Sequence, residues 1–170
     1  MVKPSRIILI GMPGAGKTTV GRLLATRMGV QFIDLDAEIE LQEGRKITEI
    51  FAGEGEGKFR VLEARALQAV AGNPSPLVLA AGGGTPCFFS NLDVMQAMGT
   101  LVYLAAPAAW LIERTAGEQQ RPLLQEDHAR KITDLLRARE EYYLQAGVHI
   151  QVQGKSPREI ADEIATRLKG

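Results

Sequence analysis

Residues 7–19 read IILIGMPGAGKTT, and this stretch decides the fold class. Its four apolar residues, Ile7–Ile10, predict a strand covered on both faces, as in parallel sheets. A glycine-rich segment follows directly, and GRLLATRM after it is typical of a helix. The pattern Gly-x-x-x-x-Gly-Lys-Thr is made by Gly11, Gly16, Lys17 and Thr18. A strand, such a loop and a helix in this order predict a phosphate-binding P-loop.

The chemistry of this loop requires those residue types. Glycines let backbone amides turn inward around a phosphate, and the helix N-terminus adds partial positive charge. Lys17 can reach the β and γ phosphates, and the Thr18 hydroxyl is placed to bind Mg²⁺. ATP is favoured as the nucleotide, because the chain has no N-K-x-D guanine-reading motif. We expect the nucleotide to be held by Gly14, Ala15, Gly16, Lys17, Thr18 and Thr19.

Further apolar runs alternate with segments of helical character along the chain. We expect the remaining strands at Gln31–Leu35, Leu77–Ala81, Leu101–Leu104 and Val148–Val152. This alternation predicts an α/β fold with a parallel sheet flanked by helices. Ser156, Pro157 and Glu159 are typical of a capped helix start, and Ser90 with Asp93 gives a weaker signal of the same kind.

Composition limits the classes of function. The 170 residues carry a formal net charge of zero, which argues against a surface for nonspecific nucleic-acid binding. The lone Cys87 has no partner for a disulfide or zinc site, and we interpret it as a packing residue. Neither a signal peptide nor a membrane span is indicated near the N-terminus. We expect one cytoplasmic, monomeric domain over residues 1–170.

Two carboxylates stand where the second predicted strand ends, in the sequence FIDLD. Because strand residues two apart point to one face, Asp34 and Asp36 would both reach the carboxyl edge of the sheet, where α/β folds bind ligands. One could hold Mg²⁺ through its waters, and the other could accept a hydroxyl proton. The alternative is a solvated pair that caps the next helix.

Three other features suit a small anionic ligand. Arg60 and Glu63 lie three apart on one helical face, so Glu63 could hold Arg60 toward a cleft, and a guanidinium fork suits a carboxylate. The consecutive glycines Gly82, Gly83 and Gly84 suggest a close approach to the backbone. The polar stretch TAGEQQRPLLQE, residues 115–126, resembles a binding loop or lid.

In combination, these motifs resemble shikimate kinase. The matching stretches are GMPGAGKT, FIDLD, IFAGEGEGKFRVLE, LAAGGGTP, RTAGEQQRPLL and RAREEYY, in that order. The resemblance implies a three-layer P-loop fold with a five-stranded parallel sheet and a mobile lid. It divides the chain into a P-loop at about 11–18, a shikimate-binding segment at about 34–62 and a lid at about 113–126.

The resemblance also implies residue roles. Asp36 would contact the 3-hydroxyl of shikimate, which receives the γ-phosphoryl group of ATP, and Thr18 with Asp34 would serve Mg²⁺. Arg60 and Arg139 would bind the substrate carboxylate, with Arg139 preferred over Arg137 by its spacing to Tyr143. The three glycines would form a wall against the substrate. On the nucleotide side it implies the lid residue Arg121 as a catalytic group, Arg114 near adenine, and Lys155.

One departure and two alternatives stand beside this interpretation. Gln151 occupies a position where the family commonly has an aspartate near the adenine. A sugar-acid kinase of the gluconate kinase type would share the P-loop and a carboxylate substrate. A nucleotide-binding module that regulates a partner would share only the P-loop, and the intact set of charged residues argues against it.

Overall fold

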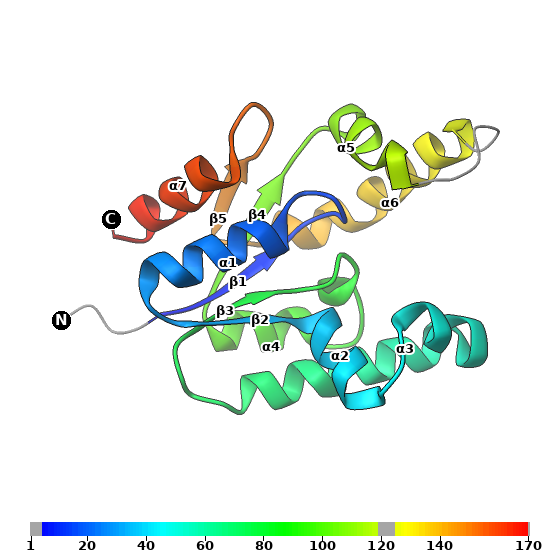
Figure 1. The fold of residues 1–170 in the computed structure, drawn as a ribbon, viewed down its shortest axis with the longest axis horizontal. Helices are drawn as coiled ribbons and strands as arrows, with labels where there is room; N and C mark the ends of the chain where they lie inside the picture. Colours follow the sequence, from blue (N-terminus) through cyan, green and yellow to red (C-terminus); the bar gives the residue numbers. More distant parts are fainter. Residues whose placement is uncertain (1–4, 119–124, 170) are drawn as a thin grey trace.

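The computed structural model describes residues 5–118 and 125–169, and in these ranges five strands form one parallel sheet (Figure 1). The order across the sheet is β2-β3-β1-β4-β5. The strands are β1 (Arg6–Ile10), β2 (Gln31–Asp34), β3 (Leu77–Ala80), β4 (Thr100–Ala105) and β5 (Val148–Gln151). All five predicted strands are therefore confirmed, each to within one or two residues at its ends.

Helices connect the strands and flank the sheet (Figure 1). They are α1 (Lys17–Met28), α2 (Leu35–Glu43), α3 (Ile47–Ala71), α4 (Asn91–Met98), α5 (Ala108–Thr115), α6 (Gln125–Tyr143) and α7 (Pro157–Lys169). Short 3₁₀ turns lie at Thr85–Cys87 and Ala116–Glu118. Helix α1 packs against α7, α3 against α4, and α5 against α6. The α/β class expected from the sequence is thus confirmed.

Strand β1 forms the centre of the core. It pairs with β3 on one side and β4 on the other, and Ile7, Ile8, Leu9 and Ile10 are fully buried. Strands covered on both faces have continuous apolar sequences, which is why the sequence IILI correctly predicts a strand inside the sheet. The P-loop follows β1 and is therefore anchored to a strand that is buried and paired on both sides.

Helix ends show which capping signals hold. The backbone amide of Glu159 donates to Ser156 Oγ at 3.1 Å, as predicted for the start of α7. Helix α4 follows Ser90 and is closed by Gly99, but no side-chain hydrogen bond from Ser90 caps it. The signal at Ser156 therefore corresponds to a side-chain cap, whereas the weaker signal at Ser90 marks the start of a helix without such a cap.

The predicted geometry of FIDLD is wrong. Strand β2 ends at Asp34, and α2 begins at Leu35, so the two carboxylates do not alternate along one strand. Asp34 is the N-cap of α2, and its Oδ1 accepts from the amide of Ala37 at 3.2 Å. Aspartate is among the best N-cap residues, and here this local bond ends the strand early. Asp36 lies in the first helical turn.

No helix within residues 5–118 and 125–169 combines the length and apolarity needed to cross a membrane.

Candidate active site

The loop between β1 and α1 has the backbone of a phosphate cradle. Gly11, Gly14 and Gly16 adopt φ of 145°, 86° and 97°, a region that side chains with a Cβ rarely occupy. Gly16 is the N-cap of α1, so the first amides of that helix open toward the loop. Such amides and the helix dipole together favour an anion. The P-loop predicted from the sequence is formed.

Lys17 lies folded back on this loop. Its Nζ donates to the carbonyl oxygen of Gly11 at 2.7 Å and to that of Met12 at 3.0 Å. Burial lowers the pKa of Lys17 from 10.5 to about 8, and the nearby Asp36 carboxylate opposes that shift. Within residues 5–118 and 125–169 the hydrogen bonds of this half-buried ammonium go to two loop carbonyl oxygens, and a phosphate oxygen could replace them as its partner.

A cavity of about 340 Å³ opens above the loop. Its lining joins the P-loop to the ends of β2 and β3 and to the end of α5: Pro13, Gly14, Gly16, Lys17, Thr18, Thr19, Asp34, Asp36, Ala81, Gly83, Arg114 and Thr115. Thr18 Oγ1 donates to Asp34 Oδ2 at 2.8 Å across this cavity. Among the described residues no group of three His, Cys, Asp or Glu side chains gathers to enclose a metal. A hydroxyl and one carboxylate instead suit Mg²⁺, which takes its other ligands from phosphates and water.

Asp36 reaches the same cavity from the first turn of α2. Burial raises its pKa from 3.8 to about 6, and the carboxylates of Asp34 and Glu63 add to that rise. A raised carboxyl pKa in a cleft is typical of a group that exchanges a proton during a reaction. The sequence left open whether the two carboxylates serve the reaction or only cap the helix. In the structure Asp34 caps the helix and also contacts Thr18, whereas Asp36 lines the phosphate cavity.

A second cavity, of about 550 Å³, adjoins the first, because Pro13 and Thr115 line both. Its lining comes from the P-loop, α3, α5 and α6: Pro13, Phe51, Glu56, Arg60, Thr115, His128, Lys131, Ile132, Leu135 and Arg139. Arg60 and Arg139 therefore meet at one cavity, although 79 positions separate them in the numbering 60 to 139. Two guanidinium groups at one site suit a carboxylate ligand.

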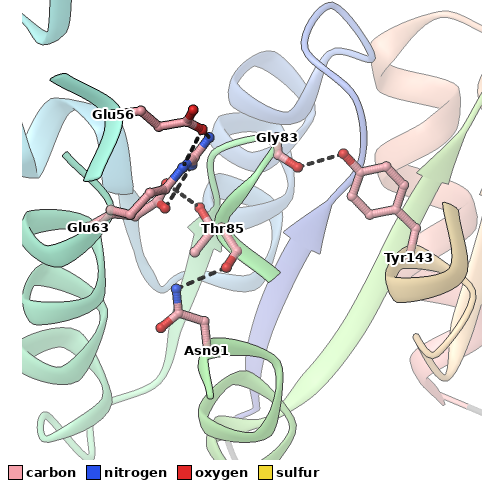
Figure 2. A network of polar contacts seen from close by, with 7 residues as sticks. Glu56, Glu63, Gly83, Thr85, Asn91 and Tyr143 are labelled. Atoms are coloured by element: carbon pink, nitrogen blue, oxygen red, sulfur yellow. Dashed lines mark hydrogen bonds and ion pairs between the residues drawn. The ribbon is translucent and has the colours of Figure 1, made fainter. Parts of the chain in front are cut away.

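Arg60 is fixed by a buried network (Figure 2). Its Nη1 donates to Glu63 Oε1 at 2.9 Å, and Thr85 Oγ1 donates to Glu63 Oε2 at 2.8 Å. The residue exposure is 7% for Arg60 and 1% for Glu63, so this is no surface ion pair. The inference that Glu63 holds Arg60 toward a cleft is confirmed. Thr85 and Asn91, which extend this network, were not found from the sequence because their spacing follows no local period.

The three glycines after β3 are explained by close packing. None has a φ in the left-handed region. A Cβ on Gly82 would lie 3.1 Å from Asp36 Oδ1, one on Gly83 would lie 3.0 Å from Arg139 Nη1, and one on Gly84 would lie 2.6 Å from Arg60 Nη2. The groups that approach are side chains of the protein itself, and Pro13 atoms would be nearest to a Cβ on Gly83, at 2.7 Å. That these glycines form a wall against the substrate stays a prediction.

Tyr143 ties α6 to this glycine segment. Its hydroxyl donates to the carbonyl oxygen of Gly83 at 2.5 Å, and burial raises the pKa of Tyr143 far above its ordinary value (Figure 2). Arg139, one turn earlier, is half-buried at the cavity, whereas Arg137 is exposed. The structure thus supports the preference for Arg139 that rested on its spacing to Tyr143.

The remaining predicted residues are placed unequally. Arg114 lines the phosphate cavity, with its guanidinium 5.0 Å from the Trp110 ring. Lys155 is not among the residues that line either cavity, and its Nζ pairs with Glu163 Oε2 at 2.7 Å. Gln151 is exposed at the end of β5. The lid arginine Arg121 lies outside the described residues.

Two residues that sequence reasoning did not assign join the walls of the site. Thr115 Oγ1 lies 2.8 Å from His128 Nε2, in a buried contact between α5 and α6. The methyl group of Thr115 would meet a Cβ on Gly14 at 2.5 Å. No motif marks this contact, because its two partners belong to different helices. Cys87 has its pKa raised by burial to about 11, in agreement with a packing role.

The site combines a phosphate cradle, a carboxylate of raised pKa in the same cavity, and an adjoining cavity with two arginines. These features define the class of protein: a P-loop phosphotransferase that acts on a small anionic acceptor. The family model described as shikimate kinase matches residues 13–169. The chain belongs to the shikimate kinase family, and it is an ATP-dependent kinase.

Individual relatives agree with that membership. A shikimate kinase of Persephonella marina is 40% identical over 163 residues, which cover 96% of this chain and 98% of that protein. The structure of a shikimate kinase from Acinetobacter baumannii in complex with shikimate has a TM-score of 0.90 and 38% identity, and the match covers 97% of this chain and 93% of that one. A gluconokinase from Sinorhizobium meliloti has a TM-score of 0.59 and 19% identity over 98% of this chain and 96% of its own, and so shows a common fold alone.

Proposed function

We propose that this chain transfers the γ-phosphoryl group of ATP to the 3-hydroxyl of shikimate, giving shikimate 3-phosphate and ADP. The observation that carries the proposal is the place of Asp36. Its carboxyl group lines the phosphate cavity, and its Oδ1 would lie 3.1 Å from a Cβ added to Gly82. A Cβ added to either of the next two glycines, Gly83 and Gly84, would lie similarly close to Arg139 and Arg60, respectively. An acceptor whose carboxylate binds both arginines would have its ring hydroxyls near this carboxylate.

The residue roles follow from charge and reach. Arg60 and Arg139 bind the acceptor carboxylate, and Asp36 orients the attacking hydroxyl and takes its proton. Lys17 exchanges its bonds to the loop carbonyls for bonds to the phosphates. Phosphoryl transfer depends on such positioning and charge neutralisation more than on covalent help. We assign Arg121 to the transferring phosphate and Arg114 to the nucleotide.

A divalent cation completes the site in this proposal. Thr18 and Asp34 would hold Mg²⁺, the Thr18 hydroxyl directly and the Asp34 carboxylate through water. Bound there, the cation would supply positive charge that neutralises the phosphates of the nucleotide. We propose that the chain works as a cytoplasmic monomer without nucleic-acid or membrane partners. Its formal net charge of zero supports the absence of a nonspecific nucleic-acid partner.

The test is ADP release by the purified protein with Mg·ATP and shikimate, quinate, gluconate or no acceptor. We expect release with shikimate alone, and its loss in Asp36→Asn. Release with gluconate instead would identify a sugar-acid kinase. No release above the ATP-only background with any acceptor, despite binding of ATP, would favour a regulatory nucleotide-binding module.

A further inference from the structure

A second carboxylate lies on the substrate-binding arginine. Glu56 Oε1 accepts from Arg60 Nη2 at 3.2 Å and from Arg60 Nε at 3.3 Å (Figure 2). We infer that Glu56 is an internal competitor: its carboxylate occupies the edge of Arg60 that the substrate carboxylate takes, so substrate binds by displacing it. This inference rests on the proposed function, since it assumes that Arg60 binds the substrate carboxylate.

The surroundings of Arg60 leave that edge as the available one. Its Nη1 is bonded to the buried Glu63. The ring of Phe88 lies 4.1 Å from the guanidinium carbon, and a Cβ on Gly84 would meet Nη2 at 2.6 Å. Arg60 and Glu56 both line the 550 Å³ cavity. The edge formed by Nε and Nη2 is also the one that can bind a carboxylate with two parallel hydrogen bonds.

The two carboxylates on Arg60 differ in how firmly they are held. The Glu63 side chain is 1% exposed and also accepts from Thr85 Oγ1. The Glu56 side chain is 57% exposed, and within the described part of the chain its ion-pair partner is Arg60 alone. The Glu56 carboxylate therefore stays largely in contact with water while it binds the buried Arg60, so it loses little solvation in the pair and regains it when it leaves. Glu63 is therefore a permanent support, and Glu56 is a ligand that can leave.

The backbone around Glu56 gives it freedom to leave. Helix α3 is interrupted at Gly55, where φ is 82° and ψ is 175°. Neither Gly55 nor Gly57 has a neighbouring atom within 4 Å of an ideal Cβ. The helix bends at Gly55 and the space beside both glycines is open, so the exposed Glu56 side chain can turn away from Arg60 without disturbing packed neighbours. Glu56 can therefore swing from the cavity while Arg60 stays in the buried part of α3.

The consequence is selection for the acceptor. Only the fraction of molecules with Glu56 displaced can bind, which weakens the apparent affinity by that fraction. An acceptor that also binds Arg139 and the glycine wall compensates for the displacement, whereas a small inorganic anion does not. Glu56 thus keeps abundant anions such as phosphate from occupying Arg60.

The decisive variant is Glu56→Gln, which keeps the shape of the side chain and removes its charge. We expect the Kd of shikimate, measured by calorimetry without ATP, to fall about three- to tenfold. The KM for shikimate should fall in parallel, kcat should change less than twofold, and inorganic phosphate should become a stronger competitor of shikimate. Glu56→Ala should show the same direction of change.

The matched control is Glu54→Gln. Glu54 belongs to the same glycine-rich segment and pairs with Arg45 rather than Arg60, so this variant removes the same charge while its shikimate Kd should stay unchanged. A weaker or unaltered shikimate Kd in both Glu56 variants would overturn the inference, because a merely supporting Glu56 predicts weaker binding. If the unaltered protein binds no shikimate, the proposed function fails as well, so the two failures are distinguishable.

Discussion

Two ionisable side chains at the phosphate cavity have pKa values displaced toward neutrality from opposite directions. Lys17 is lowered to about 8 and Asp36 is raised to about 6, in both cases chiefly by burial. Between these values the lysine is charged and can pair with a phosphate, and the carboxylate is ionised and can accept a proton. Burial thus brings the pKa values of the two groups closer together than they are in free side chains.

The acidic limb of the pH profile belongs to Asp36. Protonated Asp36 cannot take the hydroxyl proton, so kcat/KM for shikimate should decrease below pH 6, by about tenfold per pH unit. Steady-state rates between pH 4.5 and 8 measure this. The residual activity of Asp36→Asn should lack that limb, and a limb of equal position in the variant would assign it to another group.

The same carboxyl group should cost stability. Because the pKa of Asp36 is raised above its ordinary 3.8, the folded state binds the proton more tightly than the unfolded chain. Its stabilising contribution is complete below about pH 4 and is lost as the pH rises through about 6. At pH 7.5 we expect Asp36→Asn to raise the free energy of unfolding by about 1–2 kcal/mol, and at pH 4 by much less. Urea denaturation at both pH values tests this, and an equal gain at both would contradict it.

At the scale of elements, the glycine segment after β3 and the helix that carries Arg60 form a single contact surface. Gly84→Ala places a Cβ 2.6 Å from Arg60 Nη2, so the guanidinium must move. We expect kcat/KM for shikimate to fall about a hundredfold, since small displacements of binding groups have effects of that size. The KM for ATP should change little.

Gly147→Ala is the control for this substitution. An ideal Cβ on Gly147 has no neighbour within 4 Å, and its φ lies outside the left-handed region. Its kinetics should match those of the unaltered protein. If Gly84→Ala bound shikimate equally well, the assignment of Arg60 to the acceptor carboxylate would be wrong.

Elements differed in how well the sequence predicted them. Strand β1 and the P-loop were predictable from the sequence. Burial on both faces requires a continuous apolar run, and positive φ angles in the loop require glycines. The turn at Asp34 was not predictable, because the same few residues fit both an alternating strand and a helix cap. The structure has the cap, in which Asp34 accepts from the amide of Ala37. Contacts between elements, such as Glu63 with Thr85, depend on tertiary packing and leave no local pattern.

At the scale of the whole molecule, ligands should stabilise the fold through both cavities. A ligand at 100 times its Kd adds about 2.7 kcal/mol, and each kcal/mol raises Tm by about 2–4 °C in a chain of this size. We therefore expect shikimate and ADP each to raise Tm by about 5–10 °C in thermal scans. In Arg139→Ala the shift with shikimate should disappear and that with ADP should persist; loss of both would indicate a damaged fold.

The strand order has a consequence for how the chain reaches this state. The central strand β1 is synthesised first, yet both of its partners come much later, at Leu77–Ala80 and Thr100–Ala105. Pairing across such sequence distances is slow, since long loops must close before any contact forms. A nascent chain on the ribosome therefore exposes the apolar residues Ile7–Ile10 of β1 without either neighbour until β3 has been made, and with one side unpaired until β4 emerges. During that interval β1 is open to aggregation and to chaperones, so the strand at the centre of the finished core is a hazard while the chain is being made.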